Sequence, residues 1–477
     1  MEGGERMTVE RGESFDHLRE RSLGLPQVLF QSITHMGPGL AVAFSLLVGF
    51  SFAGAAMPLS VLLAILVILM IANSVGQLAK EMPSAGGLYT YTSRALGPKS
   101  GFLVGWSLGF VELIIAPSVF LITGNILATS VGLPWWFWTI LATGIVFLLN
   151  YWGVRLSTNT GIALGIIEIV AFLALGVYMI ASAGDANTWQ VFNPANSLEG
   201  TWSGVFKGMI FSILAFQGFE AAAPLGEEAN NPRRTIPQAV LGSALLIGLF
   251  YLICAYGAVV GWGFGDMQTY ADNADPWHKM ATTFWGPAWI IIFFAILNSA
   301  LGNANGGVIA ATRIVYSMGR IDLLPRIFGR THPTHRTPHV AVIGQSVFAL
   351  VVALGLGFVF GPVGGFSINA TALTILAILV YIVICIASMV FYLRERRTEF
   401  NALLHAVFPL VAVVTLLAAL YYQYNPLPDY PIRLGDWFAL AWLLAGLLAL
   451  ALVTATRPRA IEATRDIFVE DEPPGER

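Results

Sequence analysis

The sequences THMGPGLAVAF at residues 34–44 and AFQGFEAAAP at residues 215–224 are the most informative in this chain, because each interrupts a long apolar run. The first has Gly-Pro-Gly at residues 37–39, where a continuous helix would lose roughly 3 kcal/mol for the proline and about 1 kcal/mol for each glycine. The second has Gly218 close to Glu220, and lipid cannot supply hydrogen bonds to the Glu220 carboxylate. We therefore predict two helices that are broken within a bilayer.

The two breaks belong to a chain that is too apolar for a soluble domain. Of its 477 residues, 56% are hydrophobic and 11% are charged, whereas charged residues make up about 25% of ordinary soluble domains. Twelve apolar runs are long enough to cross roughly 30 Å of hydrocarbon. We predict an all-α integral membrane protein of about twelve transmembrane helices, with helices 1 and 6 broken. The runs lie near residues 28–53, 57–79, 100–127, 135–152, 159–183, 205–225, 238–263, 284–312, 339–360, 366–393, 403–423 and 436–456.

The distribution of lysine and arginine predicts the orientation of these helices. When the loops are assigned alternately to the two sides of the membrane, 22 of the 25 lysine and arginine residues share the side of the N-terminal tail. Only Lys207, Lys279 and Arg433 fall on the other side. Because positive residues stay in the cytoplasm, we predict a multi-pass protein of the cell membrane with both termini cytoplasmic.

Both breaks fall in the first helix of a set of five. An odd number of helices inverts the second set relative to the first, so the sets are predicted to be inverted repeats, and matched interruptions in such repeats mark a binding site near the midplane. Two unrelated helix kinks are the alternative. The predicted divisions are an N-terminal tail (1–27), a transport core (28–393) with a first repeat (28–183) and a second repeat (205–393), helices 11 and 12 (403–456), and a C-terminal tail (457–477).

Three further sequences carry a resemblance to a known family. They are EMPSAGGLYTYTSRALGPKSGFLVGW at 81–106, GFEAAAPLGEEANNPRRTIPQA at 218–239 and ATRIVYSMGRIDLLPRIFGRTHPTHRTPHVA at 311–341. Together they resemble the cytoplasmic signatures of the amino acid–polyamine–organocation (APC) superfamily permeases, of the amino acid permease type. The resemblance implies a leucine-transporter-like fold with a five-plus-five inverted repeat.

The resemblance also implies where a solute binds. The broken helix 1 would offer N–H groups to a carboxylate, and the broken helix 6 would offer carbonyl groups to an ammonium group, in agreement with the partial charges of helix ends. Pro38 replaces the small residue that is usual in the family and has no N–H, so an amine without a carboxylate is a second candidate solute. The residues predicted to bind substrate are Gly37, Pro38, Gly39, Leu40, Ala215, Phe216, Gln217, Gly218, Phe219 and Glu220.

Two titratable residues near the breaks are candidates for coupling or gating. Glu220 could take up a proton at one stage of a transport cycle, or it could be a neutral acid that ties the broken backbone together. His35 lies one turn before the Gly-Pro-Gly sequence, and histidine titrates near physiological pH. The alternative is that His35 only packs between helices, with its hydrogen bonds made within the protein.

Three polar residues deeper in the helices complete the coupling candidates. Glu112 in helix 3 and Glu168 in helix 5 lie near mid-span, so each needs a partner or a proton. In some members of the family a lysine of helix 5 stands in for a bound sodium ion, whereas here the closest polar residue is Glu168. In helix 8, Ser299 and Asn303 lie on a stripe next to that of Asn298, Gly302 and Asn305, and together they form a polar face. This face serves either helix packing or a sodium site between helices 1 and 8.

The predicted function is a secondary active transporter that moves an amino acid or a closely related amine by alternating access, coupled to protons or exchanging solutes, with sodium less favoured. A polyamine- or ethanolamine-type amine carrier is an alternative, and so is a non-transporting receptor or a channel on the same scaffold. The chain has no GxxxxGK[ST], HExxH or GxSxG sequence. We therefore expect no enzyme activity, catalytic residue, cofactor or metal. Its net charge of −3 indicates no nucleic-acid partner, and the cysteine-free GLPWW connection at 132–136 indicates no disulfide-linked subunit.

Overall fold

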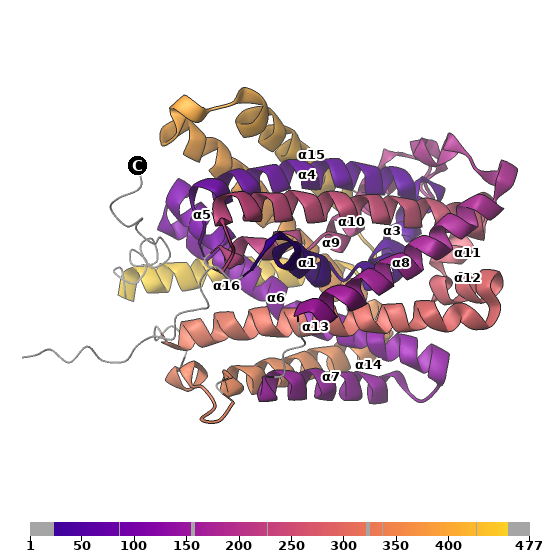
Figure 1. Ribbon diagram of the computed structural model, residues 1–477, viewed down its shortest axis with the longest axis horizontal. Coiled ribbons are helices and arrows are strands. Elements are labelled where there is room, and N and C mark those ends of the chain that lie inside the picture. The colour runs from indigo at the N-terminus through magenta and orange to yellow at the C-terminus, as the bar shows by residue number, and fades with distance from the viewer. Residues whose placement is uncertain are drawn as a thin grey trace, which may run out of the picture.

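The computed structural model shows a bundle of long helices (Figure 1). The structure describes residues 23–84, 86–153, 158–226, 228–320, 325–335, 337–425 and 427–456, and within these ranges it contains no β-strand. Most of the predicted N-terminal tail (residues 1–22) and the whole predicted C-terminal tail (residues 457–477) lie outside the described residues. The all-α fold class is confirmed for the described part of the chain.

The helices of eight residues or more make up most of the described chain. They are α1 (Leu25–Met36), α3 (Leu46–Ala53), α4 (Met57–Glu81), α5 (Leu88–Leu96), α6 (Pro98–Val131), α7 (Trp135–Trp152), α8 (Thr158–Ser182), α9 (Trp202–Ala215), α10 (Pro232–Trp262), α12 (Pro276–Trp285), α13 (Trp289–Arg320), α14 (His339–Arg394), α15 (Phe408–Tyr424) and α16 (Arg433–Thr456). The short helices α2 (Pro38–Leu40) and α11 (Met267–Ala271) connect them.

Ten helical runs within the described residues are long and apolar enough to cross a membrane. Two of these runs, Leu25–Glu81 and His339–Arg394, have 57 and 56 residues, whereas one crossing needs about 20. Each contains a glycine with a positive φ, Gly54 at 50° and Gly361 at 74°, which L-residues with a side chain rarely adopt. A multi-pass membrane protein is therefore shown, and the count of twelve crossings stays a prediction.

The first interruption falls between α1 and α2. Helix α1 ends at Met36, and Gly37 adopts φ 56° and ψ 66°, a left-handed conformation that ends the right-handed helix. Pro38 then begins a new helical stretch, a position where its missing N–H costs nothing. This stretch runs through a π-helix (Ala41–Ser45) into α3.

The second interruption follows α9. The helix ends at Ala215, and Gly218 adopts φ 110°. The chain continues as a 3₁₀-helix, η6 (Phe219–Leu225), rather than as an α-helix. Figure 1 shows α1 and α9 near the middle of the bundle, with α4, α10 and α15 above them and α7, α13 and α14 below. Neighbouring helices therefore surround both interruptions.

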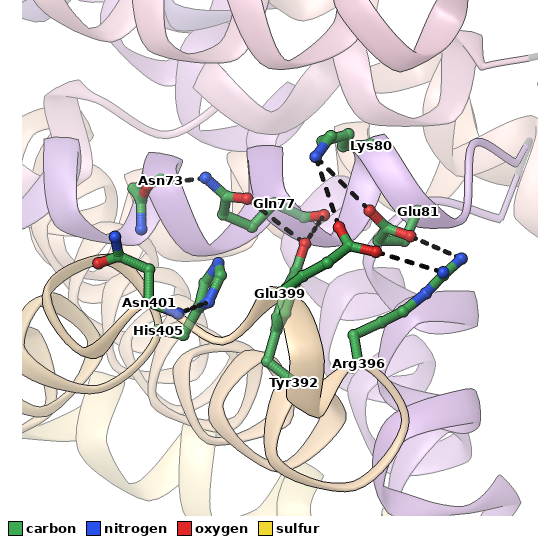
Figure 2. A network of polar contacts seen from close by, with 9 residues as sticks. All are labelled: Asn73, Gln77, Lys80, Glu81, Tyr392, Arg396, Glu399, Asn401 and His405. Atoms are coloured by element: carbon green, nitrogen blue, oxygen red, sulfur yellow. Dashed lines mark hydrogen bonds and ion pairs between the residues drawn. The ribbon is translucent and has the colours of Figure 1, made fainter.

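At one end of the bundle, a polar network joins the end of α4 to the chain around and beyond the end of α14 (Figure 2). Arg396 Nη2 lies 2.9 Å from Glu81 Oε2, and the Tyr392 hydroxyl donates to the Gln77 carbonyl at 3.1 Å. The His405 ring stacks on Tyr392 with their centroids 3.6 Å apart. These contacts fix the turn between α14 and α15 against α4.

The close approach of the two interruptions predicts that Gly218 tolerates no side chain. A Cβ at Gly218 would lie 2.6 Å from His35 Cδ2 and 2.9 Å from the Met36 nitrogen, and its φ of 110° is itself strained for alanine. We expect Gly218→Ala to lower the melting temperature of the purified protein in detergent by several degrees or to abolish its folding. Gly144→Ala in α7 is the matched control, because nothing lies within 4 Å of its Cβ position. Equal melting temperatures for the two variants would contradict this packing.

Candidate functional site

A cavity of about 60 Å³ lies where the two interruptions meet. One water molecule needs about 10–15 Å³ of such space, so the cavity has room for several waters or for one small polar group. Its walls come from five parts of the chain that are far apart in sequence. The lining residues are Met36, Leu40, Ala41, Ser45, Ile115, Ser118, Val119, Leu214, Gln217, Asn303, Phe366, Ala370 and Leu373.

Gln217 is the most informative side chain in this cavity. It is 7% exposed, and neither its Oε1 nor its Nε2 has a hydrogen-bond partner in the protein. A buried polar group without a partner costs about 1–3 kcal/mol, and such groups in native proteins call for a specific explanation. An amide that lines a cavity and has both a free donor and a free acceptor is suited to a polar ligand or to bound water.

A side chain of α13 pairs with the backbone at the first interruption. The Leu40 N–H donates to Ser299 Oγ at 3.1 Å. Beside Ser299, the Asn298 side-chain amide donates to Glu168 Oε2 of α8 at 2.6 Å. The second half of helix 1 is thus tied to α13, and α13 is tied to α8.

The backbone groups at the second interruption are also paired within the protein. The Ala215 carbonyl accepts from the Tyr251 hydroxyl at 2.7 Å. The Ser32 hydroxyl donates to the Phe219 carbonyl at 2.8 Å, and its oxygen accepts from the Ala222 N–H at 3.0 Å. One hydroxyl of α1 therefore holds two backbone groups of η6. Each carbonyl keeps a second lone pair that a further donor could use.

A separate titratable cluster joins α1, α6, η6 and α14. His35 Nε2 lies 3.4 Å from Glu112 Oε2, and Glu220 acts electrostatically on the same imidazole. Glu220 Oε1 accepts from the Tyr381 hydroxyl at 3.0 Å, and Glu220 Oε2 accepts from the Gly218 N–H at 3.2 Å. Glu220 therefore both caps the second interruption and belongs to a charged group that could exchange a proton.

The predicted site residues fall into three places. Leu40 and Gln217 line the cavity, whereas the other predicted substrate-binding residues form the two interruptions and do not line it. Of the predicted coupling residues, His35, Glu112 and Glu220 form one cluster, whereas Glu168 bonds to Asn298, the neighbour of Ser299.

Several lining residues of the cavity were not predicted to bind a solute. Ser118 of α6 and Phe366 of α14 belong to helices that have no interruption at the site. A serine within an apolar run was the only available signal for Ser118. Asn303 belongs to the face predicted for helix packing or a sodium site, and its side chain donates to the His35 carbonyl of α1.

Comparisons with known proteins point to one family. The family model described as "Amino acid permease" matches residues 27–456. The chain is 25% identical over 461 residues to the low-affinity putrescine importer PlaP of Escherichia coli (strain K12), a match that covers 94% of this chain and 96% of that protein. It is 25% identical over 384 residues to the branched-chain amino acid permease BcaP of Lactococcus lactis subsp. cremoris (strain MG1363), covering 74% of this chain and 81% of that protein. It is also 24% identical over 371 residues to the gamma-aminobutyric acid permease of Escherichia coli (strain K12), covering 75% of this chain and 78% of that protein.

The double role of the Ser32 hydroxyl predicts a large effect from a small change. We expect Ser32→Ala to destabilise the protein by about 1–3 kcal/mol, because it removes two buried side-chain hydrogen bonds to the backbone at the second interruption. Thr415→Ala is the matched control, since the exposed Thr415 hydroxyl donates only to the Val411 carbonyl of its own helix. Thermal denaturation in detergent measures both variants, and a Ser32→Ala protein as stable as the control would argue against the bridge.

Proposed function

Because the chain belongs to the amino acid permease family, we propose that it is a secondary active transporter that moves an amino acid or a related amine across the cell membrane. The observation that carries this proposal is the cavity at the two interruptions, with the unpaired Gln217 amide in its wall. The names of the relatives cover amino acids, gamma-aminobutyric acid and putrescine. Both solute classes, amino acid and amine, therefore belong to the proposal.

Alternating access is the proposed mode of action. In an inverted repeat of residues 28–183 and 205–393, each interrupted helix has two halves that can tilt separately about a glycine. Gly37 and Gly218 both have the left-handed backbone that such a hinge position uses. The distribution of lysine and arginine over the loops supports a cytoplasmic position for both the N-terminus and the C-terminus.

The proposed carrier is not an enzyme. Its alternatives are a channel and a non-transporting receptor on the same scaffold. A carrier binds its solute in each cycle, so its flux saturates and internal solute accelerates uptake. Flux through a channel does not show both properties, and a receptor binds without flux. Purified protein in liposomes, loaded and unloaded with amino acids and amines, distinguishes the three.

The unpaired Gln217 amide gives the first test of the cavity. We expect Gln217→Leu to raise KM about tenfold or more or to abolish saturable uptake, because the solute loses a buried hydrogen-bonding partner. Gln268→Leu, at an exposed position of α11, is the control and should leave KM unchanged. Uptake of labelled solutes into liposomes measures both. Equal KM values for the wild type and Gln217→Leu would show that the Gln217 amide does not bind the solute.

Proton coupling is proposed for the cluster of His35, Glu112 and Glu220. These three residues come within reach of one another at the junction of the two interruptions. A proton that binds here would change the charge beside Gly218 and His35, the residues at which the two broken helices touch. The cluster is therefore placed to link protonation to helix movement.

We expect Glu220→Gln to abolish the acceleration of uptake by an inward proton gradient. Glutamine cannot take up the proton, yet its amide oxygen can still accept a hydrogen bond from either the Tyr381 hydroxyl or the Gly218 N–H. His35→Gln should shift the pH profile of uptake, because it removes the second titratable group. Liposomes with an acidic exterior, with sodium replaced by choline, measure both effects. Unchanged proton acceleration in Glu220→Gln would assign Glu220 a structural role, and loss of uptake on sodium removal would favour a sodium-coupled carrier.

A further inference from the structure

A second cavity, of about 490 Å³, lies between α6, α14 and α16. It shares no lining residue with the cavity at the interruptions. Three of its lining side chains, Phe348, Val351 and Phe438, are large, apolar and exposed. Because they belong to helical runs that are long and apolar enough to cross a membrane, these side chains face lipid. The second cavity therefore opens toward the hydrocarbon of the bilayer.

A pair of tryptophans holds one wall of the second cavity in place. Trp106 Nε1 donates to the Trp442 carbonyl at 3.0 Å, and Trp442 Nε1 donates to the Trp106 carbonyl at 3.0 Å. Their rings stack with centroids 4.7 Å apart, and the Phe110 ring lies 4.8 Å from that of Trp442. Helix α16 is thus fixed to α6, and it cannot move to close the second cavity without breaking both hydrogen bonds.

One buried polar group lies in this otherwise apolar wall. Asn369 of α14 lines the second cavity and is 2% exposed, and its Nδ2 has no hydrogen-bond partner within the described residues. The other polar side chain of the lining, Trp442, has its Nε1 paired. A buried water makes about three hydrogen bonds, which the side chains of this wall cannot supply. The free Asn369 N–H therefore calls for an acceptor on an otherwise apolar occupant.

The bend in α14 sets the depth of Asn369 in the bilayer. The two parts of the helix fold back on each other, because a Cβ at Gly365 would lie 3.0 Å from Leu356 Cβ, whereas nine residues of straight helix would separate them by about 13 Å. Trp135 packs on the next residue, Gly357, and tryptophan rings favour the membrane interface. Asn369 lies one helical turn beyond Gly365, about 6 Å deeper than this interface. The ester carbonyls of phospholipids lie just beneath the headgroups, at such a depth.

We propose that the second cavity binds one acyl chain of a phospholipid, and that the ester carbonyl of that chain accepts a hydrogen bond from Asn369 Nδ2. The volume lies within the range of about 300–1,000 Å³ that is typical of ligand pockets, so it has room for a long hydrocarbon chain. A helix of a second copy is less suited, because a transmembrane helix pairs its carbonyls within itself, whereas an ester carbonyl is free. The site is separate from the proposed function, and its test needs no transport.

Photolabelling in vesicles tests this proposal. The full chain is placed in phosphatidylcholine vesicles that include phosphatidylcholine with a diazirine on one acyl chain, and mass spectrometry locates the labelled residues after illumination. Leu448 of α16 is exposed and does not line the second cavity, so it reports ordinary contact with lipid. We expect the lining residues of α14 and α16 to be labelled about fivefold or more above Leu448, because the bound chain gains a buried hydrogen bond.

Substitution of Asn369 tests the polar anchor. Asn369→Leu keeps the approximate size of the side chain and removes the donor, so we expect labelling of the second cavity to fall about fivefold. Asn125→Leu is the matched control. Asn125 is also buried and its Nδ2 also lacks a partner within the described residues, but it does not line the second cavity. Labelling in Asn125→Leu should equal that of the wild type.

Filling the second cavity tests its occupancy. Ala441→Trp places a large ring in the cavity and should abolish the labelling of its lining residues. Ala451→Trp, at an exposed position of the same helix outside the lining, is the control and should leave labelling unchanged. If Ala441→Trp does not fold, the wild type and Asn369→Leu decide between them.

Three results would overturn the proposal. The first is wild-type labelling of the lining residues no stronger than that of Leu448, which would show ordinary lipid contact only. The second is unchanged labelling in Asn369→Leu or in a folded Ala441→Trp protein. The third is a dimeric protein in the vesicles whose lining residues are protected from the label, which would assign the second cavity to a second copy of the chain.

Discussion

The structure depends on one constraint, which is that every backbone N–H and C=O group within a bilayer needs a partner from the protein. An unbroken helix meets this need by itself, whereas the two interruptions free several groups at once. Side chains from other helices supply the missing partners. Ser32 of α1 holds η6, Tyr251 of α10 holds the end of α9, and Ser299 of α13 holds the start of the second half of helix 1. The interruptions are thus stabilised by their neighbours rather than by their own helices.

This arrangement connects stability to movement. A helix half that is held by side-chain hydrogen bonds can change partners at a cost of about 1 kcal/mol per bond, whereas bending an intact helix breaks its own ladder. The two interruptions also hold each other, because Gly218 packs against His35 and Met36 with no room for a side chain. A shift of one broken helix must therefore be followed by the other. Such mutual dependence is the physical basis on which one site could open alternately to two sides.

The interruptions were visible in the sequence because their causes are local. Gly37 and Gly218 adopt positive φ values, and Pro38 begins a helix, as the conformational preferences of these residues dictate. Their partners were not visible, because Ser32 and Phe219 are 187 positions apart and Leu40 and Ser299 are 259 positions apart. The apolar patterns of the helices show that helices exist but not which faces meet. Ser118 and Phe366 reach the cavity through helix packing alone.

The charge balance at the interruptions connects the question of the solute with the question of the coupling ion. Glu112 and Glu220 face a single imidazole, that of His35, and buried carboxylates in low dielectric persist only when they are paired, hydrogen-bonded or protonated. Glu168 accepts a hydrogen bond from Asn298 and lies outside this group. Glu112 and Glu220 share His35, which balances one of them at most. The remaining negative charge requires a proton or a positively charged solute, and whichever arrives first reduces the attraction for the other.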